Sequence, residues 1–121
     1  MADLTAIMNW TFIEEIPVPA DLEAMLIEGE EARVAYKTVR DTAVITNKRL
    51  LIADNQGITG KKIEIYTIPF KSIDMYSSEN GGTFDMNAEL ELWTRSGRFK
   101  LNVNKKVDIR KLDRILAEAI L

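Results

Sequence analysis

The sequence contains no histidine and no cysteine among its 121 residues. Their absence excludes a Ser/His/Asp triad, a thiolate nucleophile, a zinc finger, a haem ligated by either residue and an imidazole pH switch. Only carboxylate, lysine or backbone chemistry remains, and the sequence predicts no catalytic residue, no metal site and no cofactor. With 46% hydrophobic and 29% charged residues, the composition is that of an ordinary globular domain with one core.

Long hydrophobic runs are also missing from the chain. No apolar run exceeds about five residues, whereas a membrane span needs about 20. The start of the chain, Met1-Ala2-Asp3-Leu4, lacks the basic residues and the apolar stretch of a secretory signal. Because the lack of cysteine also fits a reducing compartment, we expect a cytoplasmic protein.

Basic side chains are absent from residues 1–31, which hold eight acidic ones. Residues 32–94 hold eight of each sign, and residues 95–121 hold eight basic and three acidic side chains. Two arrangements fit these opposite end charges. Either the acidic segment folds over the basic C-terminal helix of its own molecule, or it meets the basic end of another copy. The second is a head-to-tail contact, which generates a ring or a filament.

Residues 1–30 are expected to form a helical and extended arm, and residues 31–121 the main body of a single domain. Four apolar residues near helical spacing predict a short amphipathic helix in the first dozen residues: Leu4, Ile7, Met8 and Phe12. Pro17 and Pro19 favour an extended stretch, after which residues 21–26 favour one or two helical turns.

From Ala32 onward, apolar and polar residues alternate with a period of two for most of the next seventy residues. This pattern predicts about seven short antiparallel strands. Pro69 ends one strand, and residues 70–76 are expected to form the next. The clearest alternation forms a hairpin around Ser96-Gly97, in which Glu89 and Glu91 share a face and pair with Lys100.

The last segment returns to a helical period, with Asp108 as its N-cap. Its apolar stripe consists of Ile109, Leu112, Ile115, Leu116, Ala119 and Ile120. Because so short a helix is marginal alone, it must dock this stripe on the strands. The predicted fold class is therefore mainly β, all-β or α+β, closed by a C-terminal helix.

Three motifs have a functional and a structural interpretation. The loop from Gly57 to Lys62 lacks the spacing and the Lys-Ser/Thr pair of a phosphate loop, so a glycine-rich turn is expected. Glu89 and Glu91 could serve acid–base or metal chemistry, but an exposed strand face paired with Lys100 is the simpler interpretation. The basic residues near Lys105 and Lys106 lack interleaved aromatic residues, so nucleic acid is not expected as a partner.

Several stretches, in their order and spacing, resemble the bacterial pleckstrin-homology-like (bacterial PH) family. They are residues 46–50, 56–64 and 68–73, Phe84-Asp85, residues 88–90 with Trp93, and the helix end at 117–119. The resemblance covers residues 10–121. It departs at Thr67 and Thr83, where many members are expected to carry histidine.

The resemblance implies a PH-like β-sandwich or barrel, in which two nearly orthogonal sheets are capped by the C-terminal helix. It also implies a non-enzymatic interaction module that forms a cyclic homo-oligomer, with five copies as the expected number. Strands of adjacent protomers meet in such a ring, and the shared hydrophilic surface is expected to bind an unidentified protein partner.

The family pattern suggests a partner surface on polar residues at strand ends: Asn47, Lys48, Arg49, Thr59, Lys61 and Lys62. Turn chemistry and solvated charge are the alternative for each residue taken singly. The alternative function is binding of anionic lipid or a phosphate ligand through Lys61, Lys62, Lys105 and Lys106. The loop Arg40-Asp41-Thr42 carries one base and one acid where eukaryotic PH domains bind phosphoinositides with several bases, so a membrane is not expected as a partner.

Overall fold

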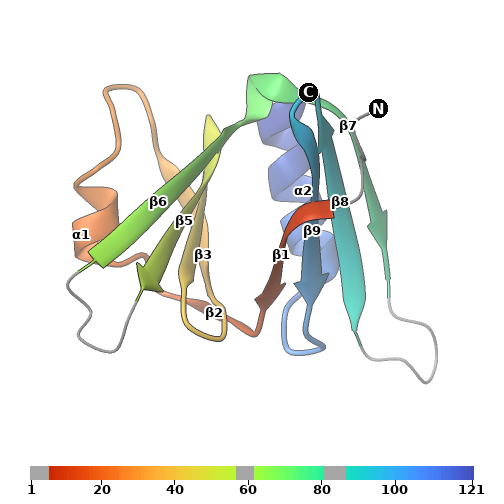
Figure 1. Ribbon diagram of the computed structural model, residues 1–121, viewed down its shortest axis with the longest axis horizontal. Coiled ribbons are helices and arrows are strands. Elements are labelled where there is room, and N and C mark those ends of the chain that lie inside the picture. The colour runs from red at the N-terminus through yellow and green to blue at the C-terminus, as the bar shows by residue number, and fades with distance from the viewer. Residues whose placement is uncertain (1–5, 57–61, 81–86) are drawn as a thin grey trace.

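Two sheets make up most of the computed structural model, which describes residues 6–56, 62–80 and 87–121 (Figure 1). The four-stranded sheet has the order β1 (Ala6–Phe12), β9 (Gly97–Val103), β8 (Ala88–Thr94) and β7 (Ile73–Glu79). The five-stranded sheet has the order β2 (Glu14–Ile16), β3 (Ala32–Lys37), β4 (Thr42–Thr46), β5 (Arg49–Gln56) and β6 (Lys62–Pro69). Neighbouring strands are antiparallel, except that β1 runs parallel to β9.

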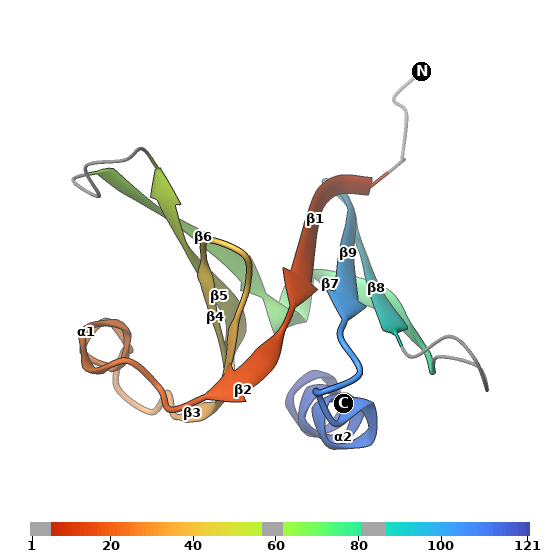
Figure 2. The same ribbon diagram turned by 90° about the horizontal axis from the view of Figure 1, so that it is seen from below.

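The chain crosses between the sheets at two points. Ile13 alone separates β1 from β2, and the 3₁₀ helix η1 (Phe70–Ser72) links β6 to β7. The helix α2 (Ile109–Ile120) lies across the space between the two sheets, and the one-turn helix α1 (Ala20–Glu23) lies beside the five-stranded sheet (Figure 2). In the described part of the chain, neither helix is long and apolar enough to span a membrane.

The helix predicted in the first dozen residues is wrong, because residues 6–12 form strand β1. Trp10 and Phe12 are buried, whereas Asn9 and Thr11 lie on the other face, which is the two-residue period of a strand. The backbone of Met8–Phe12 pairs with Phe99–Val103 of β9. Because this partner lies some ninety residues away, the local spacing of apolar residues could not reveal the strand.

The predicted fold class is confirmed, with nine strands among the described residues in place of about seven. The two additional strands are β1 and β2, which lie in the segment expected to be an arm. In the strand expected at residues 70–76, the first three residues form the 3₁₀ helix η1 instead. The strand β7 begins at Ile73 and continues to Glu79. Ser72 Oγ donates to the Pro69 carbonyl oxygen at 2.6 Å, which closes the turn, and Phe70 is buried within it.

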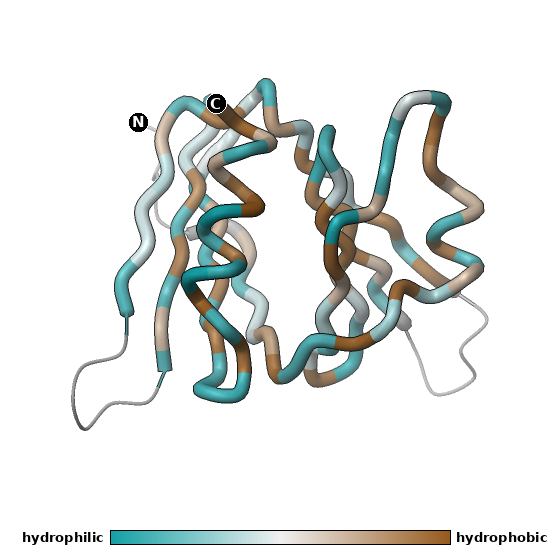
Figure 3. The backbone as a smooth tube through the Cα atoms, turned by 180° about the vertical axis from the view of Figure 1, so that it is seen from behind, coloured by the Kyte–Doolittle hydropathy of each residue, from teal (hydrophilic) through white to brown (hydrophobic). Residues whose placement is uncertain are grey.

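The C-terminal helix is confirmed as α2, together with its cap. Asp108 Oδ1 accepts hydrogen bonds from the amides of Arg110 and Lys111, both at 3.1 Å. Leu112 and Leu116 are fully buried against the main core, and Figure 3 shows hydrophobic residues recurring along the helix. The apolar stripe therefore docks between the sheets, as its periodicity predicts.

Both faces of the five-stranded sheet are covered. Alternate residues of β4 and β5, such as Ile45 and Leu50, belong to the main core between the sheets. The residues between them, Val44 and Leu51, pack in a second cluster with Leu22 of α1. This double burial explains why the two strands read as continuous apolar runs and not as an alternation.

Tyr36 is a polar exception in the main core. Its ring stacks on Phe12 with centroids 4.9 Å apart, and the residue is only 1% exposed. Its hydroxyl has no hydrogen-bond partner among the described residues. Burial, together with the charges of Glu15 and Asp108, raises the pKa of this phenol, so it stays neutral.

The substitution Tyr36→Phe is expected to leave the free energy of unfolding unchanged or to raise it by up to about 1 kcal/mol, because it removes a buried donor that has no partner. Urea denaturation followed by tryptophan fluorescence measures this change. The control is Tyr66→Phe, because the Tyr66 hydroxyl donates to Glu64 Oε1 at 2.9 Å at an exposed position. We expect that control to change stability by less than about 0.5 kcal/mol. A loss above about 1 kcal/mol for Tyr36→Phe contradicts the assignment of its hydroxyl as unpartnered.

Candidate functional site

The structure describes four of the six residues predicted to form the partner surface, and these four lie at the two ends of β5. Asn47 and Lys48 form the turn between β4 and β5, and Arg49 begins β5. Lys62 pairs with Gln56 at the opposite end of this eight-residue strand, roughly 23 Å away at about 3.3 Å per residue. Thr59 and Lys61 lie outside the described residues, and the side chain of Lys62 is not described either.

A buried ion pair between Glu30 and Arg49 lies beside this turn. Glu30 Oε2 accepts hydrogen bonds from Arg49 Nε at 2.9 Å and from Thr46 Oγ1 at 2.7 Å. Glu30 Oε1 accepts from Arg49 Nη2 at 3.1 Å and from the Ile27 amide at 3.0 Å. The Glu30 side chain has no exposed surface, and that of Arg49 is 19% exposed. Four donors therefore satisfy a carboxylate that is shielded from water.

The pKa of Glu30 reflects two opposing effects. Burial raises it, because leaving water penalises the charged form. The hydrogen bonds from Arg49, Thr46 and the Ile27 amide, with the positive charge of Arg49, lower it by more. The pKa of Glu30 therefore lies below its ordinary value, and the group is ionised at neutral pH.

Arg49 and Asn47 both hold the segment between α1 and β3. Arg49 Nη2 donates to the Met25 carbonyl oxygen at 3.3 Å. Asn47 Nδ2 donates to the Gly29 carbonyl oxygen at 3.1 Å, and its Oδ1 accepts from the Glu31 amide at 2.7 Å. These contacts support the structural interpretation for Asn47 and Arg49. Of the turn residues, Lys48 alone is exposed.

A groove of about 570 Å³ lies next to Lys48, and we call it the α2–η1 groove. Its apolar lining includes Ile27, Pro69, Phe70 and Ile120, which come from the α1–β3 segment, the end of β6, η1 and the end of α2. Lys48 and Lys71 contribute ammonium groups, and both residues are exposed. The groove thus combines apolar surface with positive charge.

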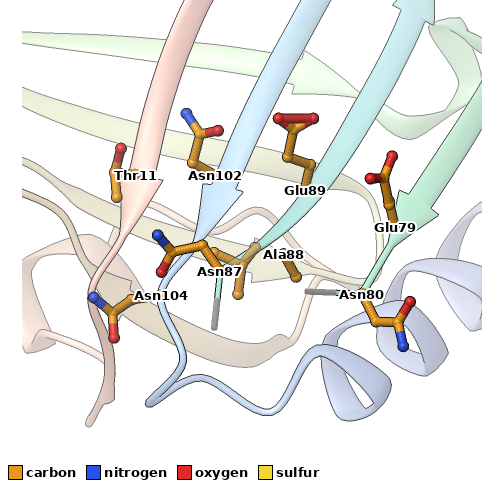
Figure 4. A pocket seen from close by; sticks show the side chains of 9 residues that line it. Thr11, Glu79, Asn80, Asn87, Ala88, Glu89, Asn102 and Asn104 are labelled. Carbon is orange, nitrogen blue, oxygen red and sulfur yellow. The ribbon is translucent and has the colours of Figure 1, made fainter. Parts of the chain in front are cut away.

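A second hollow, of about 420 Å³, lies along the four-stranded sheet and is polar. Each strand of the sheet contributes one residue to a row across it, which we call the polar row: Thr11, Asn102, Glu89 and Glu79 (Figure 4). Asn80, Asn87 and Asn104 add amide groups at the strand ends. The side chains offer many hydrogen-bond donors and acceptors, which suits a polar macromolecular surface.

Two carboxylates on this face, those of Glu89 and Glu91, have basic neighbours on β9. Glu89 Oε1 lies 3.3 Å from Lys100 Nζ, and Glu91 Oε2 lies 3.4 Å from Arg98 Nε. The predicted pairing of Glu89 with Lys100 across the hairpin is therefore confirmed. In residues 6–56, 62–80 and 87–121 there is no group of three acidic side chains placed to hold a metal ion.

Several residues that shape the α2–η1 groove are not among the site residues predicted from the sequence. Glu30, Lys71 and Ile120 belong to segments far apart in the chain, and only the fold brings them to one place. Ile120 belongs to the apolar stripe of the helix and Lys71 to the family-like stretch 68–73, but neither pattern shows that they share a groove. A lone acidic residue in a segment of many acids, such as Glu30, gives no signal that it is buried.

Removing Arg49 is expected to destabilise the fold strongly. In Arg49→Ala the buried Glu30 carboxylate loses its charged partner, which costs about 3 kcal/mol, measured by urea denaturation at pH 7. The matched control is Arg33→Ala, because Arg33 lies 3.6 Å from Glu31 in an exposed pair worth less than about 0.5 kcal/mol. Equal losses in the two variants would contradict the special role of Arg49.

The contribution of Glu30 is expected to depend on pH. The folded pKa of Glu30 is lowered, so its stabilisation is complete above the unfolded carboxyl pKa, about 4.3, and is lost as the pH falls through the folded pKa. Glu30→Gln should therefore be less stable than the parent protein at pH 7, and the difference should shrink below about pH 4. A difference that stays constant between pH 7 and pH 3 contradicts this assignment.

Comparison with known proteins identifies relatives over nearly the whole chain. A family model described as Bacterial PH domain matches residues 3–120. The uncharacterized protein YjqA of Bacillus subtilis is 46% identical over 85 residues, which cover 70% of this chain and 68% of that protein. The uncharacterized protein YozO of the same organism is 35% identical over 97 residues, which cover 80% of this chain and 84% of that protein.

Solved structures agree with this match. A protein with a pleckstrin-homology domain from Shewanella loihica superposes with a TM-score of 0.76 at 34% identity, covering 89% of this chain and 97% of that one. A pleckstrin homology domain from Shewanella amazonensis gives a TM-score of 0.66 at 39% identity, with 84% of each chain covered. The resemblance seen in the sequence is confirmed, and the chain belongs to the bacterial PH domain family.

Proposed function

We propose that this PH-like domain is a non-enzymatic, cytoplasmic interaction module that assembles head to tail into a ring and presents a polar surface to a protein partner. The observation that carries the proposal is a pair of long, uncovered edge strands. In the described part of the chain, β6 and β7 each pair with a neighbour on one side only. They have eight and seven residues.

Both edges expose apolar side chains. Ile63 of β6 is 52% exposed, and Met75 of β7 is 56% exposed. A long edge strand with exposed apolar residues is a template for pairing with another chain, and isolated proteins usually cover or interrupt such an edge. A neighbouring copy that pairs with β6 or β7 would cover the unpaired backbone groups and the exposed apolar side chains of that strand.

The positions of the two edges favour a head-to-tail contact. β6 and β7 belong to different sheets and diverge from η1 toward opposite sides of the molecule (Figures 1 and 2). Pairing β6 of one copy with β7 of the next uses two different surfaces, so each copy keeps one free edge of each kind. Such a contact closes into a ring when its rotation allows, and the family resemblance implies about five copies.

The charge distribution supports the same geometry. Asp21, Glu23 and Glu28 are exposed around α1, and Lys105 and Lys106 are exposed ahead of α2. Figure 1 shows α1 and α2 well apart, with α1 beside the five-stranded sheet. One ion pair matches the other arrangement, in which the acidic segment contacts the basic helix of its own molecule: Lys111 Nζ lies 2.9 Å from Glu15 Oε2. The charges around α1 remain available to steer a second copy.

The polar row is the surface that we assign to the protein partner. It lies on the outer face of the four-stranded sheet, opposite the core residues Leu90 and Leu101. Repetition around a ring multiplies this hydrogen-bonding surface, and several weak contacts made together bind more tightly than one. The basic neighbours of Glu89 and Glu91 suit these carboxylates to recognition rather than to acid–base catalysis.

Assembly is tested by native mass spectrometry at micromolar concentration. We expect the parent protein at about five times the 13.7 kDa chain mass. Ile63→Lys and Met75→Lys place a charge on each edge and should both give monomers. Val39→Lys changes a residue that is 75% exposed in the β3–β4 loop, and it should keep the ring. A parent protein that remains a monomer contradicts the assembly.

Mixing the two edge variants distinguishes a head-to-tail contact from a two-fold one. The Met75→Lys copy keeps β6 and the Ile63→Lys copy keeps β7, so the mixture should form a heterodimer with one intact contact. In a two-fold contact through β7, the Ile63→Lys variant dimerises by itself. That second result contradicts the ring.

Anionic-lipid or phosphate binding is the second candidate function. The exposure of Lys105 and Lys106 favours it, since neither residue has an ion pair in the described part of the chain. We expect no co-sedimentation with phosphatidylserine liposomes at low salt, where electrostatic attraction is strongest. Binding that Lys105→Glu with Lys106→Glu abolishes, and that Lys37→Glu does not, would favour the lipid function instead.

A further inference from the structure

Among residues 6–56, 62–80 and 87–121, no side chain fills the α2–η1 groove, and the groove shares no lining residue with the polar row. Phe70 is 3% exposed at its base, while Ile27 is 62% exposed at its rim. Its volume of about 570 Å³ lies in the range of ordinary ligand pockets. The groove can therefore take apolar side chains of a ligand without a rearrangement of the core.

The charged side chains that line the groove leave more positive than negative charge accessible to a ligand. The Glu30 carboxylate is buried and neutralised by Arg49 at 2.9 Å, so neither group offers a free charge. Lys48 and Lys71 are exposed and have no ion pair among the residues that the structure describes. The groove consequently presents an excess of positive charge beside apolar surface, and it complements a ligand that is both acidic and apolar.

We propose that the α2–η1 groove binds an acidic segment of a protein partner, in which one or two large apolar side chains are flanked by aspartate or glutamate. The apolar side chains occupy the space over Phe70 and Ile120, and the carboxylates lie near Lys48 and Lys71. This inference rests on the proposed function in taking a protein as the partner, and it adds a second contact site, apart from the polar row, with the chemistry of the segment that binds there.

A polypeptide fits this groove better than a compact ligand does. The lining comes from four separate segments, and exposed Ile27 extends the apolar surface at the rim. A continuous chain can contact the interior and this rim together. Pro69, which lines the groove, ends β6 and has no amide hydrogen to donate to an added strand. A second copy that pairs along β6 therefore need not extend over the groove, so the two contacts are compatible.

The test is fluorescence anisotropy with a labelled peptide of about twelve residues that places two leucines among glutamates. A matched peptide carries glutamine in place of every glutamate. The parent protein should bind the acidic peptide at least about tenfold more tightly than the neutral one, and Lys48→Glu with Lys71→Glu should remove most of that difference. Ile27→Ser should also weaken binding, because it removes apolar contact at an exposed position.

Matched controls separate the groove from general attraction. Lys105→Glu with Lys106→Glu makes the same charge change in the β9–α2 loop, and Val39→Ser removes an apolar side chain that is even more exposed than Ile27. Both should bind the acidic peptide like the parent protein. If they weaken it as much as the groove variants do, or if the neutral peptide binds equally well, the inference is wrong.

Two further measurements separate this inference from its alternatives. Dodecanoate that binds with the same sensitivity to Lys48 and Lys71, while the acidic peptide does not bind, assigns the groove to a small anionic amphiphile and overturns the protein segment. Native mass spectrometry of each variant reports assembly independently of peptide binding. A parent protein that is a monomer but binds the acidic peptide contradicts the assembly and supports the groove, and a parent ring that does not bind the peptide overturns the groove alone.

Discussion

The ion pair between Glu30 and Arg49 is the contact on which the surroundings of the candidate sites depend. It fastens the segment that follows α1 to the start of β5, with Thr46 and the Ile27 amide completing the shell of the carboxylate. That segment follows α1, whose Leu22 packs on Val44 and Leu51 and shields these residues of the five-stranded sheet from water. The same contact shapes a wall of the α2–η1 groove and leaves Lys48 as its free cation in the turn.

The turn at η1 has a different consequence for the molecule. By directing the chain from the five-stranded to the four-stranded sheet, it closes the core over Phe70 and leaves β6 and β7 as edges. A closed barrel has no edges, whereas each of these two open sheets has two, and β6 and β7 are the edges that η1 connects. The feature that completes the core therefore also connects the two edge strands on which the proposed assembly depends.

The three surfaces are chemically distinct, which is consistent with separate roles. The edges offer backbone groups with Ile63 and Met75, the polar row offers amides and carboxylates, and the α2–η1 groove combines apolar lining with lysine. None of them depends on the fold class alone, since the PH-like fold serves many purposes and function belongs to the particular surface.

The sequence by itself determined the β8–β9 hairpin and α2 with its Asp108 cap, because their periods and cap are local and each buries the face that its pattern marks. It also singled out Asn47 and Arg49, but not their roles, since the partner of Arg49 lies 19 residues away in a segment without a distinctive pattern. Only the tertiary structure decided that Met8–Phe12 is a strand and that Lys48, Lys71 and Ile120 share one groove. Pairing with β9 and packing across distant segments are long-range interactions, which no local spacing of residues encodes.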